Sequence, residues 1–323
     1  MRFATIKLSS GPVCAVQLSG GGFLPVAAAA RAAGLSEAAL LDGRLQALIE
    51  GGDAALRALA PVVAAAEAGE APLAALIVAQ DRATLLAPLP RPEKNIFCVG
   101  RNYAEHIAEG ARAQNTAIAV TEVPVYFTKP RTAVIGAGAD IPIFSHVSTQ
   151  IDYEVELAII IGKPGRDIAK ADAYDHIFGY TIVNDISARD VQRRHGGQYF
   201  KGKGLDGSCP MGPVVVTRDE LADPQNIGLR IFVNGQLRQN STTAQMIFDI
   251  PTLIASLSEG LTLEPGDILA TGTPAGVGYA MVPPTFLKDG DEVVCEIDGI
   301  GRLGNPVRAA AREPAASAGR VEI

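Results

Sequence analysis

The sequence predicts a β-rich α+β protein built from two unequal parts. Gly and Pro contribute 34 and 21 of the 323 residues, a density of turn-forming residues that argues against a helical bundle. Most candidate strands lie after residue 93, where short apolar stretches are bounded by Gly, Pro or Asp. The Ala-rich segment before them adds strands and helices. We therefore expect a small N-terminal α+β domain and a larger domain of mixed strands rolled into an irregular barrel or sandwich.

The first ninety residues begin with two strands and continue with two helices. Residues 3–8 and 13–18 are strand-like and are joined by a Ser-Ser-Gly-Pro turn. Ser36 is a candidate N-cap for one Ala/Leu-rich helix, and a second helix is expected over about residues 53–68. We find no recognisable catalytic motif in this segment.

The sequence Ala-Pro-Leu-Pro-Arg-Pro at residues 87–92 marks the expected boundary. Alternate prolines hold a chain extended and prevent helix formation, as a linker requires. We therefore expect domains at residues 1–90 and 91–323.

The second domain is expected to hold many strands and few, short helices. The strands are predicted at residues 96–99, 125–128, 153–161, 180–184, 214–217, 229–234, 268–271 and 292–297. Asn-Gly at residues 234–235 is a typical hairpin turn. The helices are predicted near residues 102–109, 171–177, 188–194 and 251–258. The polar tail, residues 309–323, is expected to fray.

Composition and charge exclude several classes of function. The chain carries 28 Lys+Arg against 35 Asp+Glu, a net charge of −7, and so lacks the basic patch that a nucleic-acid partner requires. We find neither a signal-peptide pattern nor an apolar run long enough to cross a membrane. The four cysteines are isolated, with no CxxC pair, as is typical of buried thiols in a reduced, cytoplasmic protein. We expect a cytoplasmic protein with no nucleic-acid or membrane partner.

Two glutamates two residues apart open an apolar strand. In Asp-Tyr-Glu-Val-Glu-Leu at residues 152–157, strand alternation places Glu154 and Glu156 on one face. Adjacent carboxylates repel each other and are costly to desolvate, a conflict that a divalent cation resolves. Oxygen ligands suit Mg²⁺, Mn²⁺ or Ca²⁺ better than zinc. On spacing alone, a solvated strand end with two surface glutamates is an equally good interpretation.

A third acid, Asp185, follows another apolar strand and favours the metal interpretation. Carboxylates at the ends of two central strands can converge on one ion. Asp185 can equally cap the helix that is predicted to begin near residue 188, which is a common structural role.

His106 and Glu109 are three residues apart in a predicted helix that Asn102 can cap, so their side chains share a face. A carboxylate beside an imidazole fixes its tautomer and favours a general base acting on water. From spacing alone, an ordinary surface ion pair is the simpler interpretation.

Two glycine-rich stretches complete the candidate features. Residues 195–207 hold five glycines around two lysines, one of them Lys203, and predict a flexible cationic loop that closes on an anionic substrate. A mobile surface loop with solvated lysines is the alternative. Residues 271–278, Thr-Gly-Thr-Pro-Ala-Gly-Val-Gly, offer backbone amides and the Thr273 hydroxyl to a carboxylate, or form only a tight turn. Neither stretch matches a phosphate or dinucleotide loop.

Together, seven segments resemble the fumarylacetoacetate hydrolase family in their order. They are GRNY at residues 100–103 with the His-Glu pair, FTKP at 127–130, DYEVEL at 152–157, NDISARDVQ at 184–192, KGLDGSCP at 203–210, VNG at 233–235 and TGTPAGVG at 271–278. The resemblance covers about residues 94–308. It implies a barrel-like catalytic core of mixed strands and assembly as a homodimer.

The resemblance also implies roles for the residues of these segments. Glu154, Glu156 and Asp185 are expected to bind Mg²⁺ or a similar ion, Mn²⁺ or Ca²⁺, which chelates the 2-oxo-carboxylate end of the substrate. His106 and Glu109 match the pair that activates water, and Lys203 matches the lysine that stabilises an enolate or oxyanion. The positions expected to hold or surround the substrate are Arg101, Lys129, Arg189, Gln192 and Thr273.

The implied reaction is hydrolysis of a C–C bond in a 2,4-dioxo acid, an acylpyruvate such as fumarylpyruvate, of the kind met in aromatic breakdown. Activated water attacks the distal carbonyl, and the chelated 2-oxo acid leaves as a stabilised enolate. The first alternative is an isomerase or decarboxylase of a related 2-oxo acid, of the hydroxyheptadienedioate or oxaloacetate type. The second alternative is a catalytically silent metabolite-binding protein.

Overall fold

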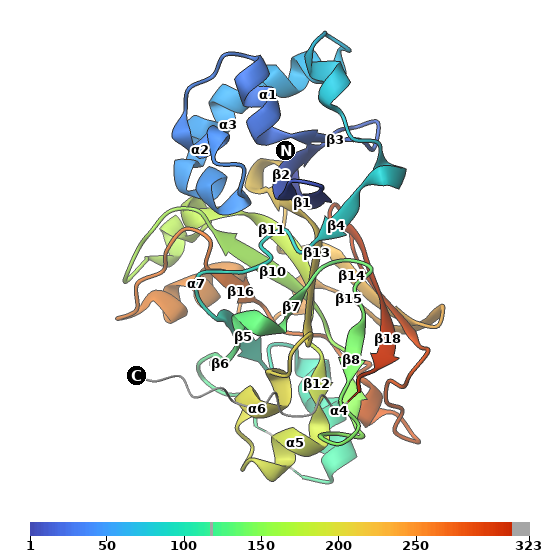
Figure 1. Cartoon of the computed structure of the whole chain (residues 1–323). Coiled ribbons are helices and arrows are strands. Elements are labelled where there is room, and N and C mark those ends of the chain that lie inside the picture. Colours follow the sequence, from blue (N-terminus) through green and yellow to red (C-terminus); the bar gives the residue numbers. More distant parts are fainter. Residues whose placement is uncertain (117–118, 312–323) are drawn as a thin grey trace, which may run out of the picture.

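The computed structural model describes residues 1–116 and 119–311 and is built around one large sheet (Figure 1). The strands of this sheet are β1 (Arg2–Leu8), β2 (Gly11–Gln17), β3 (Phe23–Pro25), β4 (Thr84–Leu86), β5 (Ile96–Gly100), β6 (Val125–Lys129), β7 (Val134–Ile135), β10 (Val155–Ile161), β11 (Ile177–Asn184), β13 (Cys209–Thr217) and β16 (Ile268–Ala270). The main path runs β3-β2-β1-β13-β11-β10-β16-β5-β6, with β4 on β1 and β7 on β13.

A second, five-stranded sheet packs beside the first. It comprises β8 (Ile141–Ile143), β14 (Gly228–Val233), β15 (Gln236–Thr242), β17 (Glu292–Ile297) and β18 (Gly301–Ala309), in the order β15-β14-β17-β18-β8. β9 (Ile151–Asp152) and β12 (Ser187–Ala188) form a short antiparallel pair. The predicted Asn-Gly hairpin is present between β14 and β15, where Val233 pairs with Gln236.

The helices are short, apart from one. They are α1 (Val26–Ala32), α2 (Ala38–Leu41), α3 (Leu45–Glu67), α4 (Ala104–Gln114), α5 (Arg189–Arg194), α6 (Tyr199–Lys203) and α7 (Ile250–Ser258). Single turns of 3₁₀ helix lie at η1 (Leu73–Leu76), η2 (Gln80–Arg82), η3 (Arg131–Ala133), η5 (Arg218–Glu220), η6 (Thr243–Gln245) and η7 (Gly278–Ala280), and η4 (Lys170–His176) is longer. The predicted β-rich α+β class is therefore confirmed.

The central strands are buried along their whole length and mainly apolar because both faces of the sheet are covered. Along β10, Leu157 and Ile159 belong to a buried cluster shared with the five-stranded sheet and α7. The alternate residues, Ala158 and Ile160, belong to a second cluster that includes the N-terminal helices. The sheet thus forms the middle of three layers, and its strand ends hold the candidate site.

Several local predictions need correction. Ser36 is not an N-cap: Glu37 occupies that position, and α2 is only four residues long. The helix expected over about residues 53–68 is present as the second segment of α3, which ends at Glu67. The first segment, from Leu45, was not predicted; Gly52, with φ 55° and ψ −148°, lets the two segments meet at a kink. Asn102 does not cap α4, whose N-cap is Tyr103. The predicted frayed tail lies outside the described residues from residue 312 onward.

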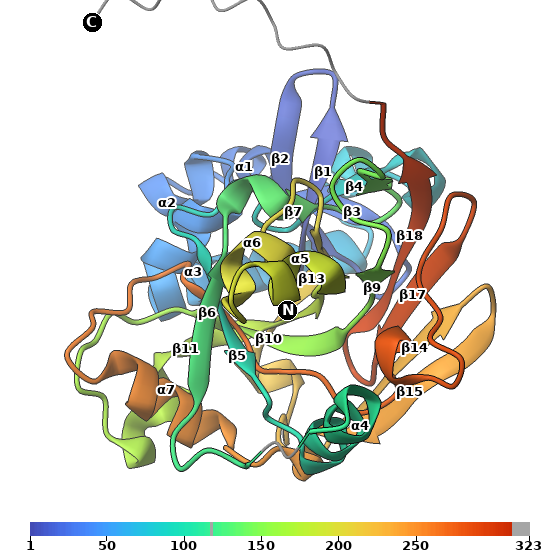
Figure 2. The ribbon, with the colours of Figure 1, turned by 90° about the horizontal axis from the view of Figure 1, so that it is seen from below.

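The segments before and after residue 90 share one sheet and one core. β1 pairs with β13, with Phe3 opposite Val215, and the Thr5 hydroxyl donates to the Pro88 carbonyl oxygen. The boundary at residue 90 stays a prediction. Figure 1 and the view from below in Figure 2 place α1–α3 at one end of the molecule and α4, α5 and α6 at the other. Within the described ranges, the helices include none with the length and apolar character needed to cross a membrane.

Candidate active site

The three predicted metal ligands converge. Glu154, Glu156 and Asp185 each place a carboxylate oxygen within 4.8 Å of the others, and all three side chains are buried. Their approach follows from strand pairing: Val155 lies opposite Asn184 in the β10–β11 pair, and the Asp185 amide donates to the Glu154 carbonyl oxygen. β10 begins at Val155, two residues later than the predicted strand, yet Glu154 and Glu156 still face the same cavity.

Buried cations compensate most of this negative charge. Lys203 Nζ lies 2.6 Å from Glu154 Oε2 and 2.6 Å from Asp185 Oδ2. Arg189 Nη2 lies 2.6 Å from Glu154 Oε1, and Lys129 Nζ lies 2.7 Å from Asp185 Oδ1. These contacts form a buried network in which each cation holds a carboxylate in place.

The two glutamates have opposite pKa shifts. Burial alone would raise the pKa of Glu154, but Lys203 and Arg189 outweigh it and lower that pKa to about 2. Burial and the neighbouring charges of Asp185 and Glu154 raise the pKa of Glu156 well above its usual value. Glu156 accepts a 2.8 Å hydrogen bond from the Gly272 amide and, within the described residues, forms no ion pair.

The donor set fits a hard divalent cation. With Asp152, which pairs with Arg189, the cluster holds four buried carboxyl groups against three cations, and Glu156 is the one without a cationic partner among the described residues. The Tyr103 hydroxyl next to this cluster is buried, has no hydrogen-bond partner among the described residues, and feels the Glu156 charge. Three convergent carboxyl groups, one of them without a cationic partner, and an unsatisfied hydroxyl are what Mg²⁺ or Mn²⁺ with its water ligands would complete.

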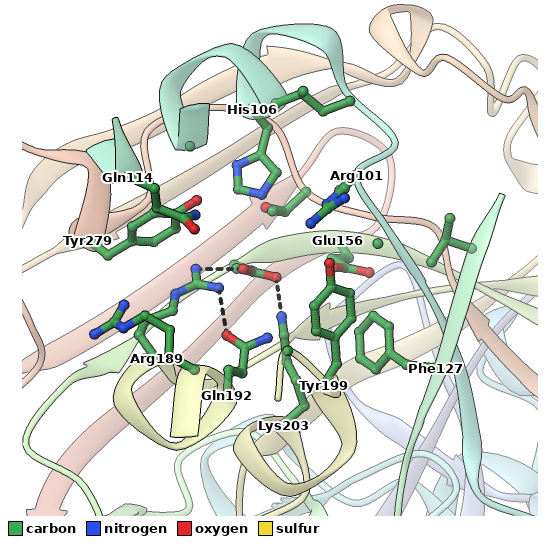
Figure 3. A pocket seen from close by; sticks show the side chains of 18 residues that line it. Arg101, His106, Gln114, Phe127, Glu156, Arg189, Gln192, Tyr199, Lys203 and Tyr279 are labelled. Atoms are coloured by element: carbon green, nitrogen blue, oxygen red, sulfur yellow. Dashed lines mark hydrogen bonds and ion pairs between the residues drawn. The ribbon is translucent and has the colours of Figure 1, made fainter. Parts of the chain in front are cut away.

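His106 and Glu109 form the predicted pair on α4. His106 Nδ1 and Glu109 Oε1 are 2.9 Å apart, and the two side chains are only 13% and 11% exposed, so this is not an ordinary surface ion pair. Glu109 Oε2 also accepts a 2.8 Å hydrogen bond from the Gly276 amide. Since Glu109 occupies the Nδ1 side of the ring, Nε2 is left as the proton acceptor. Figure 3 shows His106 and Lys203 entering the cavity from opposite sides.

The predicted flexible loop at residues 195–207 is wrong in its central part. Residues Tyr199–Lys203 form α6, and Lys203 is buried instead of solvated. Gly202 allows α6 to lie against α5, because a Cβ there would come within 2.4 Å of the Gln192 side chain. Lys203 is thus held by a packed helix against its carboxylate partners.

Two of the predicted substrate contacts face the protein itself. Lys129 is fully buried, does not line the cavity, and donates to Asp185, to the Ile186 carbonyl oxygen at 3.1 Å and to the Lys203 carbonyl oxygen. The Thr273 hydroxyl donates to the Val155 carbonyl oxygen at 2.9 Å, although the residue lines the cavity. Both residues therefore position other site residues.

The glycine-rich turn does hold carboxylates, but they are the protein's own. Its amides at Gly272, Gly276 and Gly278 donate to Glu156, Glu109 and Asp152 respectively. This turn therefore links the metal-ligand candidates, the histidine pair and the Arg189 network. The amides of these three glycines are therefore not free to bind a substrate carboxylate, although that role was expected from the sequence.

A cavity of about 180 Å³ brings the remaining predicted residues together (Figure 3). Eight of the eleven predicted site residues line it: Arg101, His106, Glu154, Glu156, Arg189, Gln192, Lys203 and Thr273. Glu109, Lys129 and Asp185 lie behind them. The cavity is therefore a polar, mainly cationic chamber above a carboxylate cluster.

Sequence reasoning missed two residues that orient Arg189. Asp152 Oδ2 lies 2.9 Å from Arg189 Nε, and the Tyr279 ring lies 4.5 Å from the guanidinium carbon. The alternation that selects Glu154 and Glu156 also includes Asp152, so a signal existed for that residue. Tyr279 follows the glycine-rich turn and shows no pattern that would predict its contact. Tyr199 and Phe127, whose rings meet edge to face, form an aromatic wall that was also not predicted.

Residues 95–308 match the family model described as fumarylacetoacetate (FAA) hydrolase C-terminal. The chain is 51% identical over 224 residues to an oxaloacetate tautomerase of Bacillus subtilis, YisK, a match covering 69% of this chain and 72% of that protein.

Solved structures give the same relationship. A fumarylacetoacetate hydrolase from Exiguobacterium antarcticum is 37% identical, with a TM-score of 0.77 over 96% of this chain and all of that one. A maleylpyruvate hydrolase from Sphingobium sp. SYK-6, in complex with manganese(II) and pyruvate, is 28% identical, with a TM-score of 0.72 over 96% of this chain and all of that one.

Proposed function

Because the chain belongs to the fumarylacetoacetate hydrolase family, we propose that it is a metal-dependent tautomerase of oxaloacetate or a closely related 2-oxo acid. The observation that carries this proposal is the 51% identity with a bacterial oxaloacetate tautomerase, combined with a cavity that joins a histidine base to a carboxylate triad. We therefore favour tautomerisation over the C–C hydrolysis predicted from sequence. Tautomerisation of oxaloacetate is an isomerisation, and it belongs to the first alternative given by the sequence, an isomerase or decarboxylase of the hydroxyheptadienedioate or oxaloacetate type.

Glu154, Glu156 and Asp185 are the residues that would hold the divalent cation. When bound, such an ion supplies a Lewis acid that polarises the 2-oxo group of the substrate and makes its C3 protons more acidic. The Mn²⁺ and pyruvate in the maleylpyruvate hydrolase relative support Mg²⁺ or Mn²⁺ as the ion and a 2-oxo acid as the ligand.

His106 is our candidate for the base that moves the C3 proton. Its Nε2 accepts a proton from C3, the C–H electron pair forms the C2–C3 double bond, and the carbonyl π-electrons move to the oxygen, which takes a proton from water. The hydroxide left behind then takes the proton from the His106 imidazolium, which restores the neutral base. Glu109 stabilises the imidazolium that forms, because its carboxylate lies 2.9 Å from Nδ1. In the reverse direction His106 returns the proton to C3.

Lys203 and Arg189 supply positive charge beside the reacting end of the substrate. Both line the cavity, and both are fixed by buried carboxylates, so their charges are already in place before the substrate binds. Gln192, whose side-chain oxygen lies 3.5 Å from Arg189 Nη1, is placed to donate its amide N–H to a substrate oxygen.

Hydrolysis of an acylpyruvate is the second candidate, and a specific observation favours it. The same His106–Glu109 pair can activate water instead of removing a carbon-bound proton, and the relative that holds Mn²⁺ and pyruvate is a hydrolase. The two reactions share the base and differ in its target: in tautomerisation it removes the C3 proton, and in hydrolysis it activates a water molecule that adds to a carbonyl before the C–C bond breaks.

A substrate panel tests the choice. With Mg²⁺, we expect rapid conversion of enol-oxaloacetate to the keto form, and slow or no production of pyruvate from fumarylpyruvate or acetylpyruvate. Efficient hydrolysis of an acylpyruvate with no effect on oxaloacetate would establish the second candidate. Saturable binding of all these acids without any turnover would mean a silent binding protein.

Assembly as a homodimer and a cytoplasmic location remain part of this proposal. Light scattering on the purified protein is expected to give twice the mass of one chain, and a monomer would contradict the homodimer.

A further inference from the structure

Arg101 is held in an unfavourable backbone conformation beside the cavity. Its φ is 60°, in the left-handed region that a long side chain rarely adopts. Such strain persists only where the surroundings impose it, and it is concentrated at functional sites. Arg101 comes directly after β5, which ends at Gly100.

The neighbours of Arg101 account for this conformation. The Asn102 side chain donates to the carbonyl oxygens of Phe248 at 3.1 Å and Thr271 at 2.9 Å, and it accepts from the Phe248 amide at 2.8 Å. On the other side, a Cβ on Gly100 would come within 2.9 Å of the Tyr199 ring. Gly100 and Asn102, on the two sides of Arg101, are thus held by their neighbours. The bend at Arg101 directs its side chain into the cavity (Figure 3).

Arg101 differs from the other arginines and the lysine of the cavity wall, because its guanidinium has no protein partner among the described residues. Arg189 and Lys203 are both paired with carboxylates, and Arg193 donates to the Gln150 side chain. Within residues 1–116 and 119–311, the Arg101 guanidinium has neither a hydrogen bond nor an ion pair. Figure 3 shows it directed into the cavity between His106 and Glu156.

We propose that Arg101 is a specificity residue that binds the far carboxylate of a dicarboxylic 2-oxo acid. This inference rests on the proposed function, in which the 2-oxo-carboxylate end of the substrate lies at the Glu154–Glu156–Asp185 cluster. A second carboxylate on the substrate then needs a further cation in the cavity, and Arg101 offers a planar guanidinium suited to bidentate contact. The fixed backbone on both sides of Arg101 sets the direction in which its side chain leaves the chain, toward the cavity (Figure 3).

Binding of a matched ligand pair tests this. Malate and lactate share a 2-hydroxy carboxylate and differ by one carboxylate, and neither undergoes tautomerisation. Their dissociation constants are measured by calorimetry on the Mg²⁺-loaded enzyme, for the wild type, Arg101→Gly, Arg101→Lys and Arg193→Met. We expect the wild type to bind malate about 10- to 100-fold more tightly than lactate, the range of one charge-assisted contact.

Arg101→Gly is expected to abolish this preference and leave lactate binding unchanged. Because glycine suits a φ of 60°, the melting temperature of this variant should equal or exceed that of the wild type, which separates lost recognition from misfolding. Arg101→Lys should keep part of the preference. Arg193→Met, the matched loss of a cavity arginine, should keep all of it.

The inference is overturned if the wild type shows no preference for malate, if Arg101→Gly retains the preference, or if Arg193→Met abolishes it. Oxaloacetate tautomerisation is measured in parallel. If the wild type lacks that activity, the proposed function fails whatever the affinities show. If the wild type is active and Arg101→Gly leaves KM unchanged, only the role of Arg101 fails, whereas a raised KM with kcat preserved supports it.

Discussion

Glu109 is the residue on which the proposed action of His106 depends. Its carboxylate holds Nδ1 of the ring and is itself held by the Gly276 amide. We predict that Glu109→Gln lowers kcat for oxaloacetate by about 10- to 100-fold, because the amide neither fixes the tautomer nor stabilises the imidazolium, and that KM changes little. Steady-state kinetics checks this. Glu105→Gln, an exposed change on the same helix, is the control and should retain full activity.

Glu156 gives the site a pH dependence whose direction can be worked out. Its pKa is raised by burial and by Asp185 and Glu154, so between the ordinary and the raised pKa the folded metal-free protein binds more protons than the unfolded chain. Its contribution to stability therefore falls as the pH rises through this window. A bound cation reverses the trend, because it requires the carboxylate.

Melting temperatures measured against pH, in EDTA and in excess Mg²⁺, test this prediction. We expect the stabilisation by Mg²⁺ to grow with pH in the wild type and to be small and nearly constant in Glu156→Gln. Equal Mg²⁺ stabilisation of the two proteins at every pH would show that Glu156 is not a ligand.

At the residue scale, local patterns predict which side chains gather but not what each one contacts. Strand alternation and helical spacing single out Glu154, Glu156 and the His106–Glu109 pair as candidates, whereas the family resemblance was needed to favour their functional roles. Lys129 and Thr273 were expected to hold or surround the substrate. Lys129 instead binds Asp185, and the Thr273 hydroxyl binds the Val155 carbonyl oxygen although the residue lines the cavity. Those partners are far away in sequence, so no local pattern contains them.

At the scale of elements, Gly272 connects the glycine-rich turn to β5 and to the metal-ligand candidates: it packs against Val99 and Asn102, and its amide donates to Glu156. Its φ is +95°, and a Cβ there would lie 2.8 Å from the Asn102 Cβ. Alanine at a positive φ carries a conformational penalty, and the close contact with Asn102 adds to it. We therefore predict that Gly272→Ala destabilises the protein by about 1–3 kcal/mol more than that conformational penalty alone. We also predict weaker Mg²⁺ binding, because the Gly272 amide holds Glu156.

Gly290→Ala is the matched control for that conformational penalty. Gly290 has a similar φ of +89° but open space around its Cβ position, so its substitution should cost about 1–2 kcal/mol and leave Mg²⁺ affinity unchanged. Denaturant unfolding and Mg²⁺ titration of both variants provide the comparison. Equal losses of stability in the two variants would show that close packing at Gly272 is unimportant.

At the element scale, sequence predicts strands better than helix limits. The apolar strands bounded by turn residues were found because burial on both faces leaves an uninterrupted apolar stretch. α6 was predicted as a loop, since its glycines favour flexible chain; the close contact with α5 that requires Gly202 is a tertiary effect. The first segment of α3, from Leu45 to the kink at Gly52, was also not predicted as helix.

At the scale of the whole molecule, the N-terminal segment completes the core of the sheet. Phe3 is fully buried, its ring lies 6.0 Å from that of Phe178, and its strand pairs with β13. We predict that Phe3→Ala destabilises the protein by about 3–5 kcal/mol and that the whole chain unfolds in one transition. Calorimetry and circular dichroism check both statements.

Leu237→Ala removes a half-exposed side chain on β15 and is the control, with an expected change within about 0.5 kcal/mol. If Phe3→Ala lowers only a separate early transition, and the Mg²⁺-stabilised transition is unaffected, residues 1–90 form an independent domain. That result would favour the boundary predicted from the proline-rich junction over the shared core.

The fold class followed from turn density and apolar strands, whereas the shared sheet did not. Strand pairing between β1 and β13 joins residues more than two hundred positions apart, and nothing in the Pro-rich junction signals that the sheet continues across it. Composition therefore indicates two segments, and long-range pairing decides how they combine.

The central claim is that a cation held by Glu154, Glu156 and Asp185, together with His106, promotes enolisation of oxaloacetate. The most direct measurement is the initial rate at which freshly dissolved enol-oxaloacetate loses its ultraviolet absorbance as it converts to the keto form, the reverse of enolisation. Three samples are compared: the wild type with Mg²⁺, Glu156→Gln at the same Mg²⁺ concentration, and the wild type in EDTA. We predict that Mg²⁺-loaded wild type exceeds the protein-free rate by at least about a hundredfold and that the other two samples fall close to it. A wild-type rate equal to the protein-free rate, or unaffected by EDTA and by Glu156→Gln, would contradict the account.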